Sequence, residues 1–239
     1  GPEVLLWEDS DAGTPGPGEV LLEQTAVGLN FIDVYHRTGL YPLPQLPATP
    51  GMEGAGRVIE VGEGVRDLGH GDRVAYAGVP VGAYAQRRLM PAERLVRLPD
   101  FIDERQAAAM MLQGMTVQYL LRRTFPVAEG DTILFHAAAG GVGLIACQWA
   151  RALGATVIGT VGSDEKAELA LAHGCDHVIR YRQEDIASRV RELTDGEGVA
   201  VVYDSVGRDT FDASLDALRP MGMLVSFGNA SGPLEPFNP

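Results

Sequence analysis

The spacing of apolar and polar positions changes near the middle of the chain. In the first hundred residues, short runs of apolar and β-branched residues are separated by glycine and proline. The clearest are residues 20–30 (VLLEQTAVGLN), 55–62 (AGRVIEVG) and 72–78 (DRVAYAG). Such runs predict strands, and the proline-punctuated stretch at 41–56 predicts a long loop. The first part of the chain is therefore expected to be β-rich and barrel-like.

Residues 103–123 follow a different pattern, rich in Ala, Met and Leu, which is typical of helix. Asp103 stands where an N-cap is expected. Gly114 predicts a break between two helices. We place the boundary between two domains here, with residues 1–112 in the first and residues 113–239 in the second.

From residue 131 onward, predicted strands and helices alternate. The strands are continuous apolar runs, as expected when helices cover both faces of a parallel sheet. A repeated strand–helix pattern predicts a doubly wound α/β domain. The expected strands are residues 132–138, 156–161, 177–181, 199–206 and 222–228, and the expected helices are residues 141–153, 164–173, 184–194 and 208–218.

The first strand-to-helix turn of this domain reads A-A-G-G-V-G at residues 138–143. Glycines in such a turn allow a tight bend, close approach of a pyrophosphate and close packing of helix on strand. Free N–H groups at the helix start attract phosphate. The turn predicts dinucleotide binding by Ala139, Gly140, Gly141, Val142 and Gly143; a tight turn without a ligand is the alternative.

The second predicted strand ends at Gly162 and Ser163, with no carboxylate to bind a ribose 2′-hydroxyl as in NAD sites. Lys166, the single lysine of the chain, follows within the first turn of the next helix. Tyr181, at the end of the third strand, is placed to add a hydroxyl. These residues predict NADP(H), with a surface role for Lys166 as the alternative.

Composition excludes some classes of function. The formal net charge is −13 and no basic patch is present, so a nucleic-acid partner is not expected. No apolar run is long enough for a membrane span, and no signal peptide is present. Cys147 and Cys175 have no zinc-ligand spacing and are expected to be inert core thiols. A cytoplasmic setting is expected.

Several motifs resemble the quinone oxidoreductases, the zeta-crystallin-like, zinc-free branch of the medium-chain dehydrogenase/reductase superfamily. They are GLNFIDVYHRTGLYP, PGMEGAGRV, GMTVQYLL, HAAAGGVGLIACQWA and VVYDSVG. The resemblance implies a GroES-like catalytic domain, a Rossmann domain with NADPH in the cleft between them, and reduction of quinones without metal. It also implies a homodimer, and that this chain lacks the first strand and a C-terminal piece of the family fold.

Zinc-dependent relatives carry a Cys ligand after an early strand and a His before the Glu of a Gly-His-Glu stretch. Here Asn30 stands near the Cys place and Met52 replaces the His. Glu53 alone cannot hold zinc, so no metal is expected.

The resemblance implies that the segment with Asn30, Asp33, Tyr35 and Tyr41 lines the nicotinamide end of the cleft. For Asn30 and Asp33, local capping is the alternative. Tyr41 would cover a flat substrate or anchor the proline-rich loop. His36 is read as a surface residue rather than a general acid.

In the second domain the resemblance assigns Thr116 to the nicotinamide carboxamide; the alternative is an N-cap at the start of a helix. Ligands gather at the carboxyl edge of such sheets. Further cofactor contacts are therefore expected from the ends of the fourth and fifth strands, at Ser205, Val206, Phe227, Gly228 and Asn229.

The implied function is NADPH-dependent reduction of quinones. A quinone needs little acid assistance, which suits a site without metal or strong acid. The alternatives are reduction of an enone or enoyl thioester by a similar site, and a non-enzymatic NADPH- or RNA-binding role. The natural acceptor and the choice between one- and two-electron transfer stay open.

Overall fold

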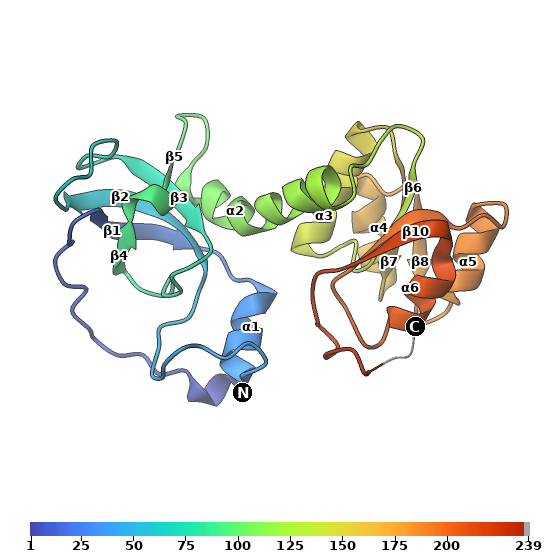
Figure 1. Cartoon of the computed structure of the whole chain (residues 1–239), viewed down its shortest axis with the longest axis horizontal. Coiled ribbons are helices and arrows are strands. Elements are labelled where there is room, and N and C mark those ends of the chain that lie inside the picture. The colour runs from blue at the N-terminus through green and yellow to red at the C-terminus, as the bar shows by residue number, and fades with distance from the viewer. Residues whose placement is uncertain (237–239) are drawn as a thin grey trace. The chain divides into compact units, whose positions relative to one another are not determined.

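The computed structural model describes residues 1–236, and it forms two compact units, Gly1–Leu112 and Gln113–Pro239 (Figure 1). The first unit contains η1 (Pro2–Val4), β1 (Glu19–Val27), α1 (Phe31–Thr38), β2 (Glu53–Val61), β3 (Arg73–Ala77), β4 (Arg87–Pro91), η2 (Ala92–Arg94) and β5 (Val96–Arg97). Helix α2 (Glu104–Tyr119) begins in the first unit and ends in the second.

The sheet of the first unit is antiparallel, with strand order β4-β1-β2-β3-β5. Its core contains Val20 and Leu22 of β1, Val58 of β2, Val74 of β3 and Met90 of β4. The three predicted strands are confirmed, but the first ends at Val27, because Asn30 already caps α1. The basic β4 and the two-residue β5 were not expected from the pattern.

The predicted helix break at Gly114 is wrong. Asp103 does cap α2, because its carboxylate accepts the Gln106 N–H at 2.7 Å, but the helix then continues through Gly114 to Tyr119. An isolated glycine costs a helix only about 1 kcal/mol and does not end it. A π-helical turn follows at Leu120–Thr124.

The second unit is a five-stranded parallel sheet in the order β10-β9-β6-β7-β8. In chain order it contains β6 (Thr132–Phe135), α3 (Gly141–Ala152), β7 (Thr156–Val161), α4 (Asp164–Ala172), β8 (His177–Arg180), α5 (Ile186–Leu193), β9 (Val199–Asp204), α6 (Phe211–Ala217) and β10 (Leu218–Ser226). The predicted doubly wound domain is confirmed. The order of strands reverses between β6 and β9, and ligands of such sheets bind at this point.

Strand β10 begins earlier than expected, and helix α6 is correspondingly shorter. Leu218, which the sequence pattern places in the helix, pairs with Val199, and the ladder to β9 resumes at Met223. Between them Met221 has φ +63°. This irregularity hides the strand from a periodicity argument.

Both faces of the parallel sheet are buried. Ile133 and Phe135 pack toward α3 and α4, whereas Leu134 packs toward α5 and α6. Cys147 and Cys175 are free, buried in the first of these layers, with their sulfur atoms 3.4 Å apart. Within the described residues, no helix is long and apolar enough to cross a membrane.

Candidate dinucleotide site and the α1 polar cluster

The turn between β6 and α3 is fixed to both neighbouring strands. The N–H of His136 donates to the Tyr203 carbonyl of β9 at 3.0 Å, and the N–H of Ala138 donates to the Thr160 carbonyl of β7 at 3.1 Å. Ala137 has φ +54°, a conformation that is uncommon for a residue with a side chain. The turn is therefore held in one conformation by the sheet itself.

Helix α3 begins without a side-chain cap. Its N-cap residue is Gly140, whereas Ser163 caps α4 and Asp185 caps α5 by accepting the N–H of Lys166 and of Ser188. The first N–H groups of a helix have no acceptor within that helix. At α3 these donors are therefore left to a ligand or to water.

Two glycines in this turn serve different purposes. A Cβ at Gly143 would lie 2.5 Å from the Ala138 carbonyl oxygen, so this glycine allows the helix to pack on the turn backbone. At Gly141 the three atoms nearest to an added Cβ all belong to the side chain of Gln113, the nearest at 2.5 Å. Gly141 itself is exposed, and Val142 beside it is half-buried. Gly141 thus leaves space over the helix start, covered in part by Gln113, which we did not anticipate.

The tip of β7 brings together the residues expected to bind a 2′-phosphate. The hydroxyl of Tyr181 lies 2.7 Å from where a Cβ of Gly162 would stand. Ser163 caps α4, and its hydroxyl accepts the Lys166 N–H at 3.4 Å. The side chain of Lys166 is exposed. One further cation, Arg180, reaches this loop through Asp164, and sequence reasoning missed it.

The segments that follow β9 and β10 run side by side. The N–H of Ala230 donates to Ser205 and the N–H of Ser231 donates to Val206, at 3.1 and 2.8 Å. A Cβ at Gly228 would lie 2.7 Å from the Ser205 carbonyl oxygen. Ser205, Val206, Phe227, Gly228 and Asn229 therefore gather at one edge of the sheet, and the Phe227 ring lies 5.9 Å from that of Phe135 at the end of β6.

A series of buried hydrogen bonds lies behind the carboxyl edge of the parallel sheet. His136 contacts the Thr160 hydroxyl at 3.0 Å and the Ser214 hydroxyl at 2.9 Å. Ser214 and Thr210 both donate to Asp204, whose other oxygen accepts two backbone N–H groups of the loop after β9. Burial lowers the pKa of His136, although the Asp204 carboxylate opposes the shift. These hydrogen bonds connect the turn before α3 to the loop after β9. No single motif in the sequence predicts them.

The structure places Thr116 in the interior of α2 rather than at a helix start, so its reading as an N-cap is wrong. The helix does not break at Gly114, which removes the helix start on which that reading depended. Thr116 is half-buried and hydrogen-bonds the side chain of Tyr119, one turn later.

In the first unit, Asn30 and Asp33 belong to a buried polar cluster at the start of α1. Asn30 Nδ2 donates to the Glu53 carboxylate at 2.6 Å, and the Asn30 N–H donates to Asp33 at 2.9 Å. The hydroxyl of Tyr84 donates to the same Asp33 oxygen at 2.7 Å. Glu53 also accepts the N–H of Leu112 in α2, at 2.8 Å. We call these residues the α1 polar cluster.

Burial dominates the electrostatics of this cluster. Glu53 is fully buried, and desolvation raises its pKa despite the hydrogen bonds from Asn30 and the α2 backbone. Desolvation and the bond to Asp33 also raise the pKa of Tyr84. The local capping considered for Asn30 and Asp33 is thus present. Asp33 Oδ2 accepts both hydrogen bonds, whereas Asp33 Oδ1 is buried and has no hydrogen-bond partner among the described residues.

Tyr35 and Tyr41 pack against each other beside this cluster, with their ring centroids 5.0 Å apart. Tyr35 is 8% exposed and also contacts the Phe31 ring, whereas Tyr41 is 37% exposed. Tyr41 therefore presents an aromatic surface to solvent, and Tyr35 supports it.

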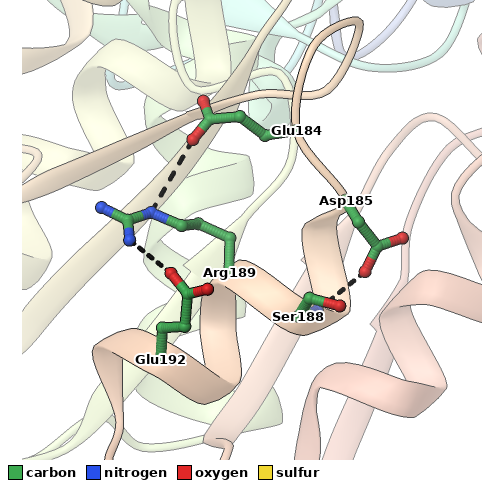
Figure 2. Close-up of a pocket in the computed structure, with 5 residues that line it drawn as sticks. All are labelled: Glu184, Asp185, Ser188, Arg189 and Glu192. Carbon is green, nitrogen blue, oxygen red and sulfur yellow. Dashed lines mark hydrogen bonds and ion pairs between the residues drawn. The ribbon is translucent and has the colours of Figure 1, made fainter.

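A surface hollow on α5 lies elsewhere in the second unit (Figure 2). Arg189 contacts Glu192 at 2.6 Å and Glu184 at 3.7 Å, and Asp185 caps the helix through the Ser188 N–H. Arg189, Glu184 and Glu192 already pair with one another and Asp185 serves as a helix cap, so the hollow does not resemble a ligand site. Within residues 1–236 no group of three or more His, Cys, Asp or Glu side chains is placed to hold a metal ion.

Two family models match the chain, an alcohol dehydrogenase GroES-like domain over residues 16–100 and a zinc-binding dehydrogenase over residues 141–239. A quinone oxidoreductase from Pseudomonas aeruginosa is 58% identical over 238 residues, which cover all of this chain and 73% of that protein. A 2-haloacrylate reductase from a Burkholderia species is 52% identical over 241 residues, covering 99% of this chain and 72% of that protein.

Solved structures give the same result. The crystal structure of Escherichia coli quinone oxidoreductase complexed with NADPH is 52% identical and superposes with a TM-score of 0.98, covering all of this chain and 73% of that chain. The relatives thus extend beyond the part of the fold that this chain spans.

Proposed function

Because the chain belongs to the quinone oxidoreductase family of the medium-chain dehydrogenase/reductase superfamily, we propose that it reduces quinones with NADPH. The observation that carries the proposal is the uncapped start of α3, at the carboxyl edge of a parallel sheet where its strand order reverses. In this family the same fold binds NADPH in the E. coli enzyme.

The residues at this edge fit a dinucleotide phosphate. The N–H groups of α3 that follow Gly140 would hold the pyrophosphate, with Ala139, Gly141, Val142 and Gly143 shaping the turn. Gly162, Ser163, Lys166 and Tyr181 would hold the 2′-phosphate. The nicotinamide half would contact Thr116, Ser205, Phe227, Gly228 and Asn229. When bound, NADPH supplies the hydride, and the protein binds, orients and shields it.

In the first unit, Tyr41 is our candidate for contact with the flat quinone, because its ring is exposed while Tyr35 holds it from behind. Asn30 and Asp33 would act through the α1 polar cluster, by fixing the start of α1 and thereby the tyrosines that follow. A quinone needs little proton donation, because its reduced anion is delocalised.

We propose that the reaction needs no zinc. The residues in the places of the Cys and His ligands are Asn30 and Met52, and the Asn30 amide donates to the Glu53 carboxylate that would otherwise face a metal. Elemental analysis is expected to find less than stoichiometric zinc, and chelators are expected to leave turnover unchanged. Stoichiometric zinc with activity lost on chelation would contradict the proposal.

The similarity to the 2-haloacrylate reductase favours one alternative function, the reduction of an activated C=C bond. Steady-state oxidation of NADPH with a benzoquinone, an enone and 2-chloroacrylate separates the two. We expect kcat/KM for the quinone to exceed that for the alkenes. The reverse order would assign the alternative, and RNA binding at physiological salt without turnover of any acceptor would overturn both.

We also propose that the protein is a cytoplasmic homodimer, as the resemblance implies. Sedimentation equilibrium of the full-length protein is expected to give twice the monomer mass. A single-protomer mass at micromolar concentration would contradict this.

A further inference from the structure

An ion pair joins the ends of two neighbouring parallel strands in the second unit. Arg180 is the last residue of β8 and pairs in register with Val161, the last residue of β7. From there its Nε reaches Asp164 Oδ1, at 2.6 Å. Asp164 is the first residue of α4, two positions before Lys166. Arg180 and Lys166 thus both lie at this edge of the sheet, near the Gly162–Ser163 loop.

The Arg180–Asp164 ion pair is expected to contribute little to the stability of the fold. The Asp164 side chain is 76% exposed and that of Arg180 is 42% exposed, and exposed ion pairs contribute little to folding. The guanidinium is also not saturated. Its Nε is buried against Asp164 and is closed to a ligand, so the donors that remain for a phosphate are on the two terminal nitrogens. A terminal nitrogen lies 3.8 Å from Glu184, whose carboxylate also lies 3.7 Å from Arg189.

Asp164 would by itself oppose NADPH. A carboxylate beyond the second strand repels a 2′-phosphate, which carries about −1.5 to −2 charges near neutral pH. The adjacent Glu165 adds a second negative charge. Arg180 neutralises Asp164 and has further N–H donors in the fork geometry that suits phosphate.

We propose that Arg180, held in place by Asp164, is a second cation for the 2′-phosphate beside Lys166, and that it helps to select NADPH over NADH. The proposal rests on the proposed use of NADPH and adds a specificity-determining residue to it. Asp164 holds the guanidinium at the loop before the cofactor arrives, and the phosphate then receives the donors that Asp164 leaves unused.

The test measures equilibrium binding of 2′,5′-ADP and 5′-AMP to the full-length protein by calorimetry, since the two probes differ only in the 2′-phosphate. Arg180→Ala is expected to weaken 2′,5′-ADP about tenfold or more and to leave 5′-AMP unchanged. Arg182→Ala removes an exposed arginine two residues away and serves as the matched control, with no change for either probe.

A second variant separates direct binding from mere masking of Asp164. In an Asp164→Asn background, Arg180→Ala should still weaken 2′,5′-ADP; if its effect disappears there, Arg180 only neutralises Asp164 and the proposal is wrong. An unchanged ratio of the two affinities in Arg180→Ala would also overturn it. If the wild-type protein itself does not prefer 2′,5′-ADP over 5′-AMP, the assignment of NADPH fails instead.

Discussion

The first N–H groups of a helix have no acceptor within that helix, and the starts of α1 and α3 differ in how these groups are satisfied. At α1 the Asn30 N–H donates to Asp33, and the Asn30 amide donates to the buried Glu53. At α3 the residue before the helix is Gly140, and no side chain caps the N–H groups. Both stretches are candidates for binding from their residue types. The comparison shows that the polar side chains at α1 bond to the backbone of the helix start and to Glu53, whereas the first N–H groups of α3 have no side-chain acceptor and are available to a ligand.

The largest expected effect is at the α1 polar cluster. Glu53→Leu removes the carboxylate that accepts hydrogen bonds from the buried Asn30 amide and from the Leu112 N–H. Each such loss costs about 1–3 kcal/mol, so the free energy of unfolding is expected to fall by about 2–6 kcal/mol in urea titrations.

Glu60→Leu is the matched control, since Glu60 is an exposed glutamate of the same strand. Its free energy of unfolding is expected to change by less than about 0.5 kcal/mol. If both variants unfold at the same urea concentration, the cluster is not structural, and its contrast with α3 is lost.

The converse is expected at α3. Gly141→Val places a branched side chain over the helix start, where the pyrophosphate is expected, and the atoms nearest to its Cβ belong to the flexible end of Gln113. NADPH binding should weaken at least about 100-fold, equivalent to about 2.7 kcal/mol, with little change in Tm. Fluorescence titration and thermal unfolding measure the two effects.

Gly143→Val sharpens this test, because its side chain would meet the backbone at Ala138 rather than a mobile side chain. We expect this variant to lose stability instead. A folded Gly141→Val protein with unchanged NADPH affinity would mean that both glycines serve packing alone.

These contrasts also explain what the sequence can predict. The alternation from β6 to β10 is predictable because strands buried on both faces are continuous apolar runs. The glycine turn is predictable because it lies between one of these strands and an apolar helix. The role of Asn30 cannot be predicted in this way. Its amide meets Glu53, 23 positions later, and this depends on how β1 pairs with β2.

The same limit applies to shorter elements and to charge pairs. Strand β4 was missed because its arginines mask the alternation, and Arg88 is in fact buried, with its guanidinium over the Tyr76 ring. Arg180 meets Asp164 only because β7 and β8 are adjacent and parallel. Residues that act through tertiary neighbours leave no local pattern.

A smaller effect is expected at Lys166, where a side chain rather than the backbone would bind the ligand. A charge-assisted hydrogen bond to the 2′-phosphate contributes about 1.5–3 kcal/mol. Lys166→Ala should therefore weaken NADPH by about one to two powers of ten and leave NADH nearly unchanged. The ratio of the two dissociation constants measures this.

Arg123→Ala provides the control for loss of one exposed positive charge in the same unit, and the ratio should not move. Some preference for NADPH should survive in Lys166→Ala, because Ser163 and Tyr181 lie at the same loop. If Lys166→Ala behaves like the control, Lys166 is a surface residue and the cofactor preference comes from elsewhere.

The smallest expected effect concerns pH and the series of buried hydrogen bonds that His136 makes behind the α3 turn. Burial lowers the pKa of His136 in the folded protein, whereas in the unfolded chain it titrates near its ordinary value of about 6.5. As the pH falls below that value, the unfolded chain takes up a proton that the folded protein does not bind. Stability is thus present above the unfolded pKa and is lost as the pH falls, by at most about 1.4 kcal/mol per pH unit.

The free energy of unfolding of the wild type should therefore fall more steeply between pH 7.5 and 5.5 than that of His136→Phe, even though the variant is less stable throughout. His177→Phe, at an exposed histidine of the same unit, should keep the wild-type slope. Equal slopes for wild type and His136→Phe would show that His136 can take up its proton in the folded state, and the turn before α3 would then be less firmly held than its contacts with Thr160 and Ser214 indicate.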